Sequence, residues 1–392
     1  MTSTTLAATG RWTATGDLPA AAGWYGRHDN AIVLADSKVL VMGGADGSSA
    51  ALARAAVYDH TTKTWTATGS LQTPRRLHTA TRLSDGRVLV AGGISGTAQF
   101  PAPGLAAAEI YDPHDGTWKT TGSMHTPRWG HSAVLVGEKV LVAGGTTIRS
   151  AQSVKALHSA ELFDPATGTW TETTPMTDAR SGHPAVVLAN SRVLVVGGTL
   201  PTARDEDTAL AYCELFDPTG NGSWTPTGAL LAPRAGHQAT ALSGGTAVLV
   251  TGGRAPGGPG DGTFDPFSRA GAELYVQDTG VWTAVPDMPG GRTLHRAVPL
   301  GTTKVLVVGG SDGAGDDVGF ASAALFDATT RSWSAAGGLA TGRFAFAAAP
   351  LSDKRVLVAG GVVRSGQAAA SPETQELTKT AEYFDVDAAV TP

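Results

Sequence analysis

Seven pairs of glycines, each ending an apolar run, restrict the fold of this chain more than any other feature. The pairs are Gly43-Gly44, Gly92-Gly93, Gly144-Gly145, Gly197-Gly198, Gly252-Gly253, Gly309-Gly310 and Gly360-Gly361. The distances between successive pairs are 49, 52, 53, 55, 57 and 51 residues. A repeat of about fifty residues is typical of the blades of a β-propeller. We therefore expect a repeat protein.

Each repeat is predicted to contain four short strands. In the second repeat, "HTATRLSDGRVLVAGG" holds two apolar segments, and "AEIYD" and "GTWKTTG" follow. Turn residues bound these segments, as they do between strands. Aromatic-Asp pairs recur at Tyr58-Asp59, Tyr111-Asp112, Phe163-Asp164, Phe216-Asp217, Phe326-Asp327 and Phe384-Asp385, and tryptophans recur at Trp65, Trp118, Trp170, Trp224, Trp282 and Trp333. The fifth repeat departs from the pattern with Tyr275-Val276.

Together, these glycines, aromatic-Asp pairs and tryptophans resemble the kelch repeat, from about Gly10 to about Asp387. The resemblance implies an all-β fold, a seven-bladed kelch-type β-propeller. We expect one domain over residues 10–387, with short tails at 1–9 and 388–392. A Trp segment around Trp12 precedes the first repeat, and the last repeat, around Tyr383, has no Trp after it. One N-terminal strand is therefore predicted to join three C-terminal strands and close the ring, which removes exposed sheet edges.

Composition excludes several classes of function. The net charge of -5 indicates no nucleic-acid-binding surface, and no apolar run reaches membrane-spanning length. The first residues lack the basic start and long apolar core of a secretory signal, so the cytoplasm is expected. Cys213 is the single cysteine and is expected to be a small buried side chain. Galactose-oxidase-like copper enzymes share the propeller architecture, but their Tyr-His ligand pair has no counterpart here, so neither a metal nor a cofactor is expected.

The links between strands differ on the two faces of the predicted ring. In a blade whose strands a to d run outward from the axis, the b-to-c and d-to-a links lie on one face. The b-to-c links are long and dissimilar, from "FPAPGL" near Phe100 to "VVRSGQAAASPETQELTKT" from Val362, whereas the opposite turns, such as "SDGR", are short. Long, dissimilar loops on a rigid scaffold usually carry function. We call this face the loop face and expect a binding site there.

An arginine recurs before the first strand of each blade and is expected to ring the pore mouth on the loop face. The set is Arg27, Arg75, Arg128, Arg180, Arg234, Arg292 and Arg343. Such a ring could bind an anion, because guanidinium groups match carboxylate and phosphate. The alternative is structural, since buried arginines need partners. Glutamates that open the third strand offer these partners: Glu109, Glu161, Glu214, Glu273 and Glu382.

Two blades lack this glutamate. Ala56 and Ala323 stand near its position in blades one and six. Two arginines would then have no carboxylate partner. They are Arg27 and Arg292 if each pair forms within one blade, or Arg75 and Arg343 if each glutamate pairs with the next blade.

Histidines and aromatic residues follow the arginines. The histidines, His78, His131, His183, His237 and His295, with His28 in blade one, are expected to hydrogen-bond backbone between strands and not to hold a metal, because equivalent positions around a ring do not converge on one ion. Residues that break the repeat are better binding candidates. At the mouth they are Trp24, Tyr25, Arg76, Trp129 and Phe344, which either form a small-molecule site or cover the blade tops.

Two hypotheses of function remain open, and the sequence does not decide whether the chain is an enzyme. The first is a small-molecule-binding propeller, such as a cofactor-independent isomerase, lyase or cyclase with an anionic organic substrate. Its candidate ligand-binding residues are Trp24, Tyr25, Arg27, Arg75, Arg76, Trp129, Arg292, Arg343 and Phe344. The second is a protein-interaction platform that binds acidic peptides. Acidic runs at Asp205, Glu206 and Asp207 and at Asp312, Asp316 and Asp317 are expected to be solvated loop carboxylates.

Overall fold

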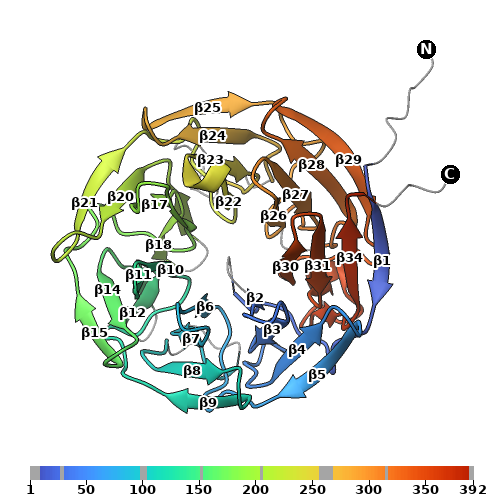
Figure 1. Cartoon of the computed structure of the whole chain (residues 1–392), viewed down its shortest axis with the longest axis horizontal. Coiled ribbons are helices and arrows are strands. Elements are labelled where there is room, and N and C mark those ends of the chain that lie inside the picture. Colours follow the sequence, from blue (N-terminus) through green and yellow to red (C-terminus); the bar gives the residue numbers. More distant parts are fainter. Residues whose placement is uncertain are drawn as a thin grey trace.

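Seven four-stranded antiparallel sheets surround a central axis in the computed structural model of the chain (Figure 1). The structure describes residues 9–26, 31–97, 104–150, 153–203, 206–255, 268–313 and 317–387. Within these residues the helical segments are two short 3-10 turns, Ser243–Gly245 and Gly366–Ala368. None of the described helices is long and apolar enough to span a membrane. The predicted all-β, seven-bladed propeller is confirmed.

The sheets follow the repeats in order, with the first strand of each blade nearest the axis. Blades one to three are β2 (Ile32–Val33), β3 (Val39–Met42), β4 (Ala55–Asp59), β5 (Thr64–Thr68); β6 (Thr79–Arg82), β7 (Val88–Ala91), β8 (Ala108–Asp112), β9 (Thr117–Thr120); and β10 (Ser132–Val136), β11 (Lys139–Ala143), β14 (Ala160–Asp164), β15 (Thr169–Glu172). Blades four to six are β16 (Ala185–Val187), β17 (Val193–Val196), β20 (Cys213–Asp217), β21 (Ser223–Thr227); β22 (Gln238–Leu242), β23 (Ala247–Thr251), β24 (Ala272–Val276), β25 (Val281–Val285); and β26 (Arg296–Leu300), β27 (Lys304–Val308), β28 (Ser322–Asp327), β29 (Ser332–Gly338). Blade seven is β30 (Ala347–Ser352), β31 (Arg355–Ala359), β34 (Ala381–Asp385) and β1 (Arg11–Thr15).

The N-terminal strand closes the ring as predicted. Strand β1 pairs antiparallel with β34, and Trp12 lies opposite Phe384. Their ring centroids are 5.3 Å apart, close to the 5.0 Å of Tyr111 and Trp118 in blade two. The Trp12 indole N–H donates to the carbonyl of Ala336 in blade six. A residue from the start of the chain therefore completes the last blade and ties it to its neighbour.

The glycine pairs are required by close approach between blades. Gly92 has φ +62°, and a Cβ atom there would lie 2.6 Å from both the Arg128 carbonyl oxygen and the His131 ring. Real Cβ atoms do not come this close to other heavy atoms. Gly93 follows with φ +96°, another left-handed value that favours glycine. The pairs therefore let the end of each second strand pack against the next blade.

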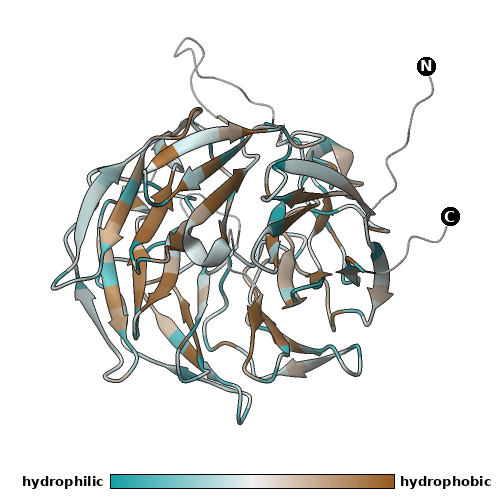
Figure 2. Ribbon diagram, turned by 45° about the horizontal axis from the view of Figure 1, so that its top comes forward, coloured by the Kyte–Doolittle hydropathy of each residue, from teal (hydrophilic) through white to brown (hydrophobic). Residues whose placement is uncertain are grey.

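The hydrophobic core lies between adjacent blades, and outer-strand residues such as Trp118 and Trp170 join the inner strands in it (Figure 2). The seam between blades seven and one, where the two ends of the chain meet, differs from the other six interfaces. Its buried apolar residues fall into two separate clusters, and one of them contains Ala22, Ala56, Ala347, Ala359 and Ala381. Small side chains leave gaps when the backbones are held apart. This seam is expected to be the least densely packed interface.

Three long links on the loop face form two-stranded hairpins. They are β12 (Thr146–Ser150) with β13 (Ser153–Ala156), β18 (Thr199–Ala203) with β19 (Glu206–Ala209), and β32 (Val362–Arg364) with β33 (Glu376–Leu377). Strand β13 packs beside β18, so the hairpins of blades three and four lie next to each other. The loops around Phe100 and from residue 256 to 267 lie outside the described residues.

Candidate functional site

The repeated arginines form buried ion pairs within their own blades. In blade two the Arg75 guanidinium donates to Glu109 at 2.7 Å and to the carbonyls of Gly92 and Ala107 at 2.9 Å each. Both charged side chains are 0% exposed. Burial lowers the pKa of Arg75, although the Glu109 carboxylate opposes that shift. The equivalent pairs are Arg128–Glu161, Arg180–Glu214, Arg234–Glu273 and Arg343–Glu382.

These pairs favour the structural interpretation of the arginine ring. The predicted Arg-Glu pairing is present, and it forms within one blade. Arg75 and Arg343, two candidates for ligand binding, have fully buried side chains whose donors already have partners. A ligand could reach them only by displacing a glutamate.

Blade six retains its arginine without a carboxylate. Arg292 donates to the carbonyls of Gly309 and Ser322 and to the Ser322 hydroxyl, and it lies over the Phe320 ring. Across the described residues no carboxylate pairs with it. The position equivalent to Glu109 is Ala324, which lies opposite Val307, so the sequence-based choice of Ala323 was one residue early. Burial lowers the pKa of Arg292 to about 10.

Blade one has lost both members of the pair. The Ala22 carbonyl accepts from Gly361 N–H at 2.8 Å, as the Arg75 carbonyl accepts from Gly44 N–H at 2.9 Å. Ala22 therefore occupies the arginine position, and the assignment of Arg27 to it was wrong. Arg27 and His28 lie outside the described residues. With Ala56 at the glutamate position, the ion pair of blade one is replaced by two alanines.

A proline accompanies each missing glutamate. Besides its arginine, Glu109 accepts the backbone N–H groups of Gln72 at 2.7 Å and Thr73 at 3.1 Å. The position of Gln72 is taken by Pro19 in blade one and Pro289 in blade six. Proline has no N–H group, so the first of the two donors that the glutamate would accept is absent in both blades. The glutamate therefore serves the backbone as well as the arginine.

A belt of backbone hydrogen bonds encircles the pore mouth just before the first strands. Its members share left-handed φ values near +50° to +65°: Trp24, Leu77, Gly130, Gly182, Gly236, Leu294 and Ala345. Six N–H groups donate to the carbonyl of the preceding member at 2.7 to 3.3 Å, and the bond from Trp24 to Ala345 crosses the closing seam. Non-glycine residues rarely adopt this backbone conformation, so we infer that the hydrogen bonds of the belt hold Trp24, Leu77, Leu294 and Ala345 in it. We call it the pore belt.

The repeated histidines are buried structural residues. His131 and His183 are hydrogen-bonded to hydroxyls of the preceding blade, Thr79 at 2.9 Å and Ser132 at 3.0 Å. His131 also has a backbone hydrogen bond with Ala91 of the preceding blade, which is the kind of partner predicted, and the hydroxyl partners are additional. Burial and the Arg75 charge lower the pKa of His78 to about 3, which keeps its ring neutral. Tyr25 takes the histidine position in blade one, and Phe346 takes it in blade seven.

The aromatic candidates at the mouth come from different blades. Trp24 packs edge-on against Phe344, with ring centroids 6.2 Å apart, and donates to the Gln375 side chain at 2.7 Å. Phe344 is buried beneath it. Trp129 and Arg76 are half-buried on blades three and two, and burial lowers the pKa of Arg76. The Arg76 Nε has no hydrogen-bond partner in the described part of the chain.

Tyr25 lines a small cavity where the blade-one ion pair is missing. The cavity has a volume of about 60 Å³, and its wall includes Ala22, Ala56 and Arg54. Burial raises the pKa of the Tyr25 phenol, although the charges of Arg54 and Arg343 oppose the shift. Because a cavity of about 150 Å³ is needed for a benzene-sized molecule, this space does not hold an organic substrate.

The acidic loop of blade six differs from its predicted state. Asp317 is buried, and its carboxylate accepts the Gly313 N–H at 2.9 Å. Burial, and then a hydrogen bond with Asp312, raise its pKa. The prediction of a solvated carboxylate was therefore wrong for Asp317. Asp205 and Asp316 lie outside the described residues.

Two further side chains with polar groups, Cys213 and Arg296, are buried inside the fold. Cys213 is buried as predicted, and burial raises the pKa of its thiol to about 11. Arg296, in the innermost strand of blade six, donates to the carbonyls of Phe346 and Gly26 at 2.8 Å each. Sequence reasoning missed this link, although a charged residue in an innermost strand was its signal. Among the described residues, no group of three or more His, Cys, Asp or Glu could hold a metal ion.

The fold, the glycine pairs and the buried Arg-Glu pairs define a kelch-type propeller. The family model "KLHDC2/KLHL20/DRC7 Kelch-repeats domain" matches residues 7–198 and 130–361. The chain therefore belongs to the kelch-repeat family. This family assignment confirms the resemblance seen in the sequence.

Known proteins are similar in sequence to parts of this chain. Beta-scruin of Limulus polyphemus is 24% identical over 53% of this chain and 22% of its own length, and Kelch-like protein terF of Aspergillus terreus is 26% identical over 71% and 57%. The chain thus spans about a fifth of the scruin and less than two thirds of terF. A solved structure titled "Novel fungal alcohol oxidase with catalytic diversity among the AA5 family, in complex with copper" covers 96% of this chain and 76% of its own, with a TM-score of 0.68 and 18% identity. That likeness shows the fold alone.

Proposed function

We propose that the loop face binds a protein partner, through an extended segment that carries apolar and acidic side chains. The observation that carries this proposal is the distribution of exposed apolar residues. Four of the five large exposed hydrophobics lie on the loop face in the described residues: Ile148 (40% exposed), Tyr212 (59%), Leu231 (63%) and Val318 (51%). Exposed apolar side chains gathered on one face are typical of interaction surfaces.

The hairpins of blades three and four supply the most defined part of this surface. Ile148 is exposed on β12, the exposed cation Arg149 follows it in sequence, and the exposed cation Lys155 lies on β13 opposite Thr147. In the part of the chain that the structure describes, neither cation has an ion-pair partner. Strand β13 packs beside β18, so the two hairpins form one continuous surface. A partner segment that alternates apolar and acidic residues would match it in both polarity and charge.

The buried ion pairs change the basis of the acidic-peptide hypothesis. The sequence offered pore-mouth arginines as the anion-binding groups, but Arg75 and Arg343 are occupied by glutamates. We assign peptide binding instead to the exposed cations of the hairpin and to the half-buried Arg76 and Trp129. Residues 10–387 form the proposed binding unit, and the cytoplasm is its proposed location, because a single cysteine is usual there.

The small-molecule hypothesis receives less support. The cavity beside Tyr25 is too small for an organic substrate, and Arg292 is buried among carbonyls. We therefore do not propose isomerase, lyase or cyclase chemistry on the loop face.

A peptide-binding experiment with matched variants tests the proposal. A displayed library of peptides with alternating apolar and acidic residues is selected on the wild-type protein, and the affinities of the selected peptides are measured. Ile148→Asp should weaken binding at least tenfold, because it places a charge in the apolar contact. Val281→Asp is the control, since Val281 is the exposed hydrophobic on the opposite face. Equal losses in both variants, or loss in V281D alone, would exclude the loop face.

A further inference from the structure

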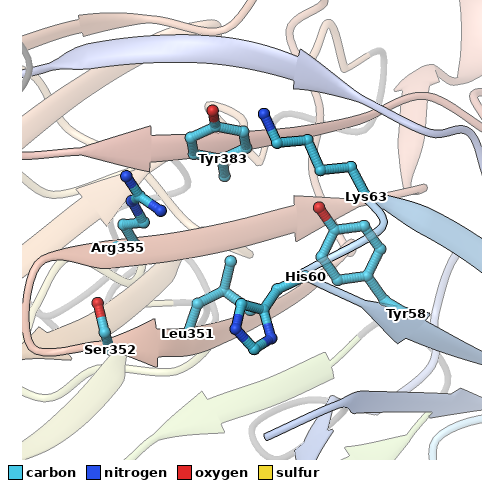
Figure 3. A pocket seen from close by; sticks show the side chains of 7 residues that line it. All are labelled: Tyr58, His60, Lys63, Leu351, Ser352, Arg355 and Tyr383. Atoms are coloured by element: carbon cyan, nitrogen blue, oxygen red, sulfur yellow. The ribbon is translucent and has the colours of Figure 1, made fainter.

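A second cavity lies on the face opposite the loops, at the seam between blades seven and one. Its volume is about 150 Å³. Its lining comes from the end of β4 and the following turn, the end of β30, the start of β31, and β34: Tyr58, His60, Lys63, Leu351, Ser352, Arg355 and Tyr383 (Figure 3). None of these residues belongs to the loop-face surface. We call this cavity the seam pocket.

Three lining residues depart from the repeat. His60 stands where other blades have Pro113, Pro165 and Pro218. Lys63 stands where other blades have Gly116, Gly168 and Gly280. Tyr383 stands where other blades have Ile110, Leu162 and Leu215. The departures come from opposite ends of the chain and meet in one cavity, so the pocket is specific to this seam.

Lys63 adopts a backbone conformation that favours glycine. Its φ is +58°, and the glycines at the same turn position have φ +67° to +70°. Left-handed backbone disfavours any residue with a Cβ atom. The lysine therefore adds a cation at a position where glycine would fit the backbone better. Arg331 of blade six shares this geometry, with φ +51°, but it does not line the seam pocket.

Two cations flank one aromatic ring in the pocket. The Lys63 ammonium lies 5.7 Å from the Tyr383 ring centroid, and the Arg355 guanidinium lies 5.6 Å from it. Arg355 also pairs with Asp385 at 2.6 Å, whereas no described carboxylate pairs with Lys63. The His60 Nδ1 is buried and has no hydrogen-bond partner in the described residues. Figure 3 shows Lys63 and Arg355 on either side of Tyr383, with Leu351, His60 and Tyr58 below them in the view.

The seam lacks one contact that other blade interfaces have. The indole N–H of Trp118 donates to the Gly69 carbonyl of the preceding blade, but the indole nitrogen of Trp65 has no partner within the described chain. What joins the seam here is the turn itself: Gly16 N–H donates to the Lys63 carbonyl at 3.0 Å, and the Thr15 and Tyr58 hydroxyls are hydrogen-bonded at 2.6 Å. A ligand held by Lys63 and Tyr383 would add a bridge across this joint.

We propose that the seam pocket binds a small planar organic carboxylate, with its carboxylate at Lys63 and its ring against Tyr58, Tyr383 and Leu351. The size fits, since a cavity of about 150 Å³ holds a benzene-sized molecule. The charge fits because Lys63 is a cation without a paired carboxylate. The flat ring fits the tyrosine faces that line the cavity.

Calorimetric titration with benzoate tests this assignment. Benzamide has the same shape without the charge, and inorganic phosphate has the charge without the ring. We expect benzoate to bind and both analogues to bind at least tenfold more weakly. No heat of binding at 10 mM benzoate (about the weakest affinity of interest), or equal binding of either analogue, would overturn the proposal.

Two variants separate the pocket from general anion binding. Lys63→Gly restores the residue that the same turn has in three other blades, so the protein should fold, and benzoate affinity should fall at least tenfold. Arg331→Gly makes the same change in blade six and should leave affinity unchanged. Tyr383→Leu, which restores the repeat on the other side of the seam, should also weaken binding. Unchanged benzoate affinity in K63G, or an equal loss in R331G, would contradict the assignment.

Discussion

Removing the Glu109 carboxylate measures how much the ring of buried ion pairs contributes to the propeller. In Glu109→Ala the Arg75 charge stays buried at 0% exposure and loses its 2.7 Å partner, while the backbone N–H groups of Gln72 and Thr73 lose their carboxylate acceptor. Breaking a buried pair by removing one member is expected to destabilise the fold by about 3–5 kcal/mol. With an unfolding entropy of about 0.8 kcal/mol/K for a chain of this length, the melting temperature should fall by about 4–6 °C.

The double variant shows whether the loss comes from the unpaired charge. Arg75→Ala with Glu109→Ala reproduces the arrangement of blade one, where Ala22 and Ala56 face each other. Its destabilisation should be smaller than the sum of the two single changes by at least about 1 kcal/mol, because the residues are coupled. Denaturant unfolding followed by tryptophan fluorescence gives these values, and Glu172→Ala, an exposed strand position, serves as the control. A loss below about 1 kcal/mol in E109A, or additive single effects, would refute the structural role of the pair.

Three further predictions concern the acid stability, the turns and the closure of the ring. The pKa of His78 is lowered to about 3, so the folded protein loses stability as pH falls below about 6.5, where the unfolded chain takes up the proton. In His78→Phe, the free energy of unfolding that is lost between pH 7 and pH 5 should shrink by about 2 kcal/mol. An identical pH profile in the variant would contradict this. Arg331→Gly should raise stability by up to about 1 kcal/mol in the same unfolding assay, because it relieves a left-handed residue, and a loss would contradict the strain. Trp12→Ala should cost about 3–5 kcal/mol, as much as Trp118→Ala, and a much smaller effect would mean that β1 is not essential to closure.

The architecture could be predicted because it repeats. Seven glycine pairs fixed the blade count, and Trp12 at one end with Phe384 at the other indicated how the ring closes. The Arg-Glu pairing could be predicted for the same reason, since two residue types recurred at matching places. When the same residue type recurs in several repeats, the prediction for its position does not depend on any single repeat.

The predictions of individual site residues were wrong where a blade departs from the repeat. In blade one the arginine position holds Ala22 and the histidine position holds Tyr25, so matching residue types pointed to Arg27 instead. In blade six an irregularity in pairing between Ser322 and Ala324 accompanies the error of one residue at the glutamate position. Neither register follows from residue identity, because only backbone contacts with the neighbouring blade define it.

The pore belt and the seam pocket also could not be predicted from the sequence. The belt uses Trp24, Leu77, Leu294 and Ala345 in a conformation that these residues rarely adopt, so local preference argues against it. The seam pocket joins His60 and Lys63 to Tyr383, which are more than 300 residues apart in the chain. Its lining residues could be noticed as departures from the repeat, but only the closed ring brings them together.

Hydrogen–deuterium exchange with a selected peptide tests the central claim, that the loop face is the protein-binding face. The peptide that binds wild-type protein most tightly is added at saturation, and exchange is compared with the free protein. We predict slower exchange in the hairpins β12–β13 and β18–β19 and in the segment around Trp129, with no change in β25, which begins at Val281. Protection confined to the opposite face, or no protection of either hairpin at saturation, would contradict the account.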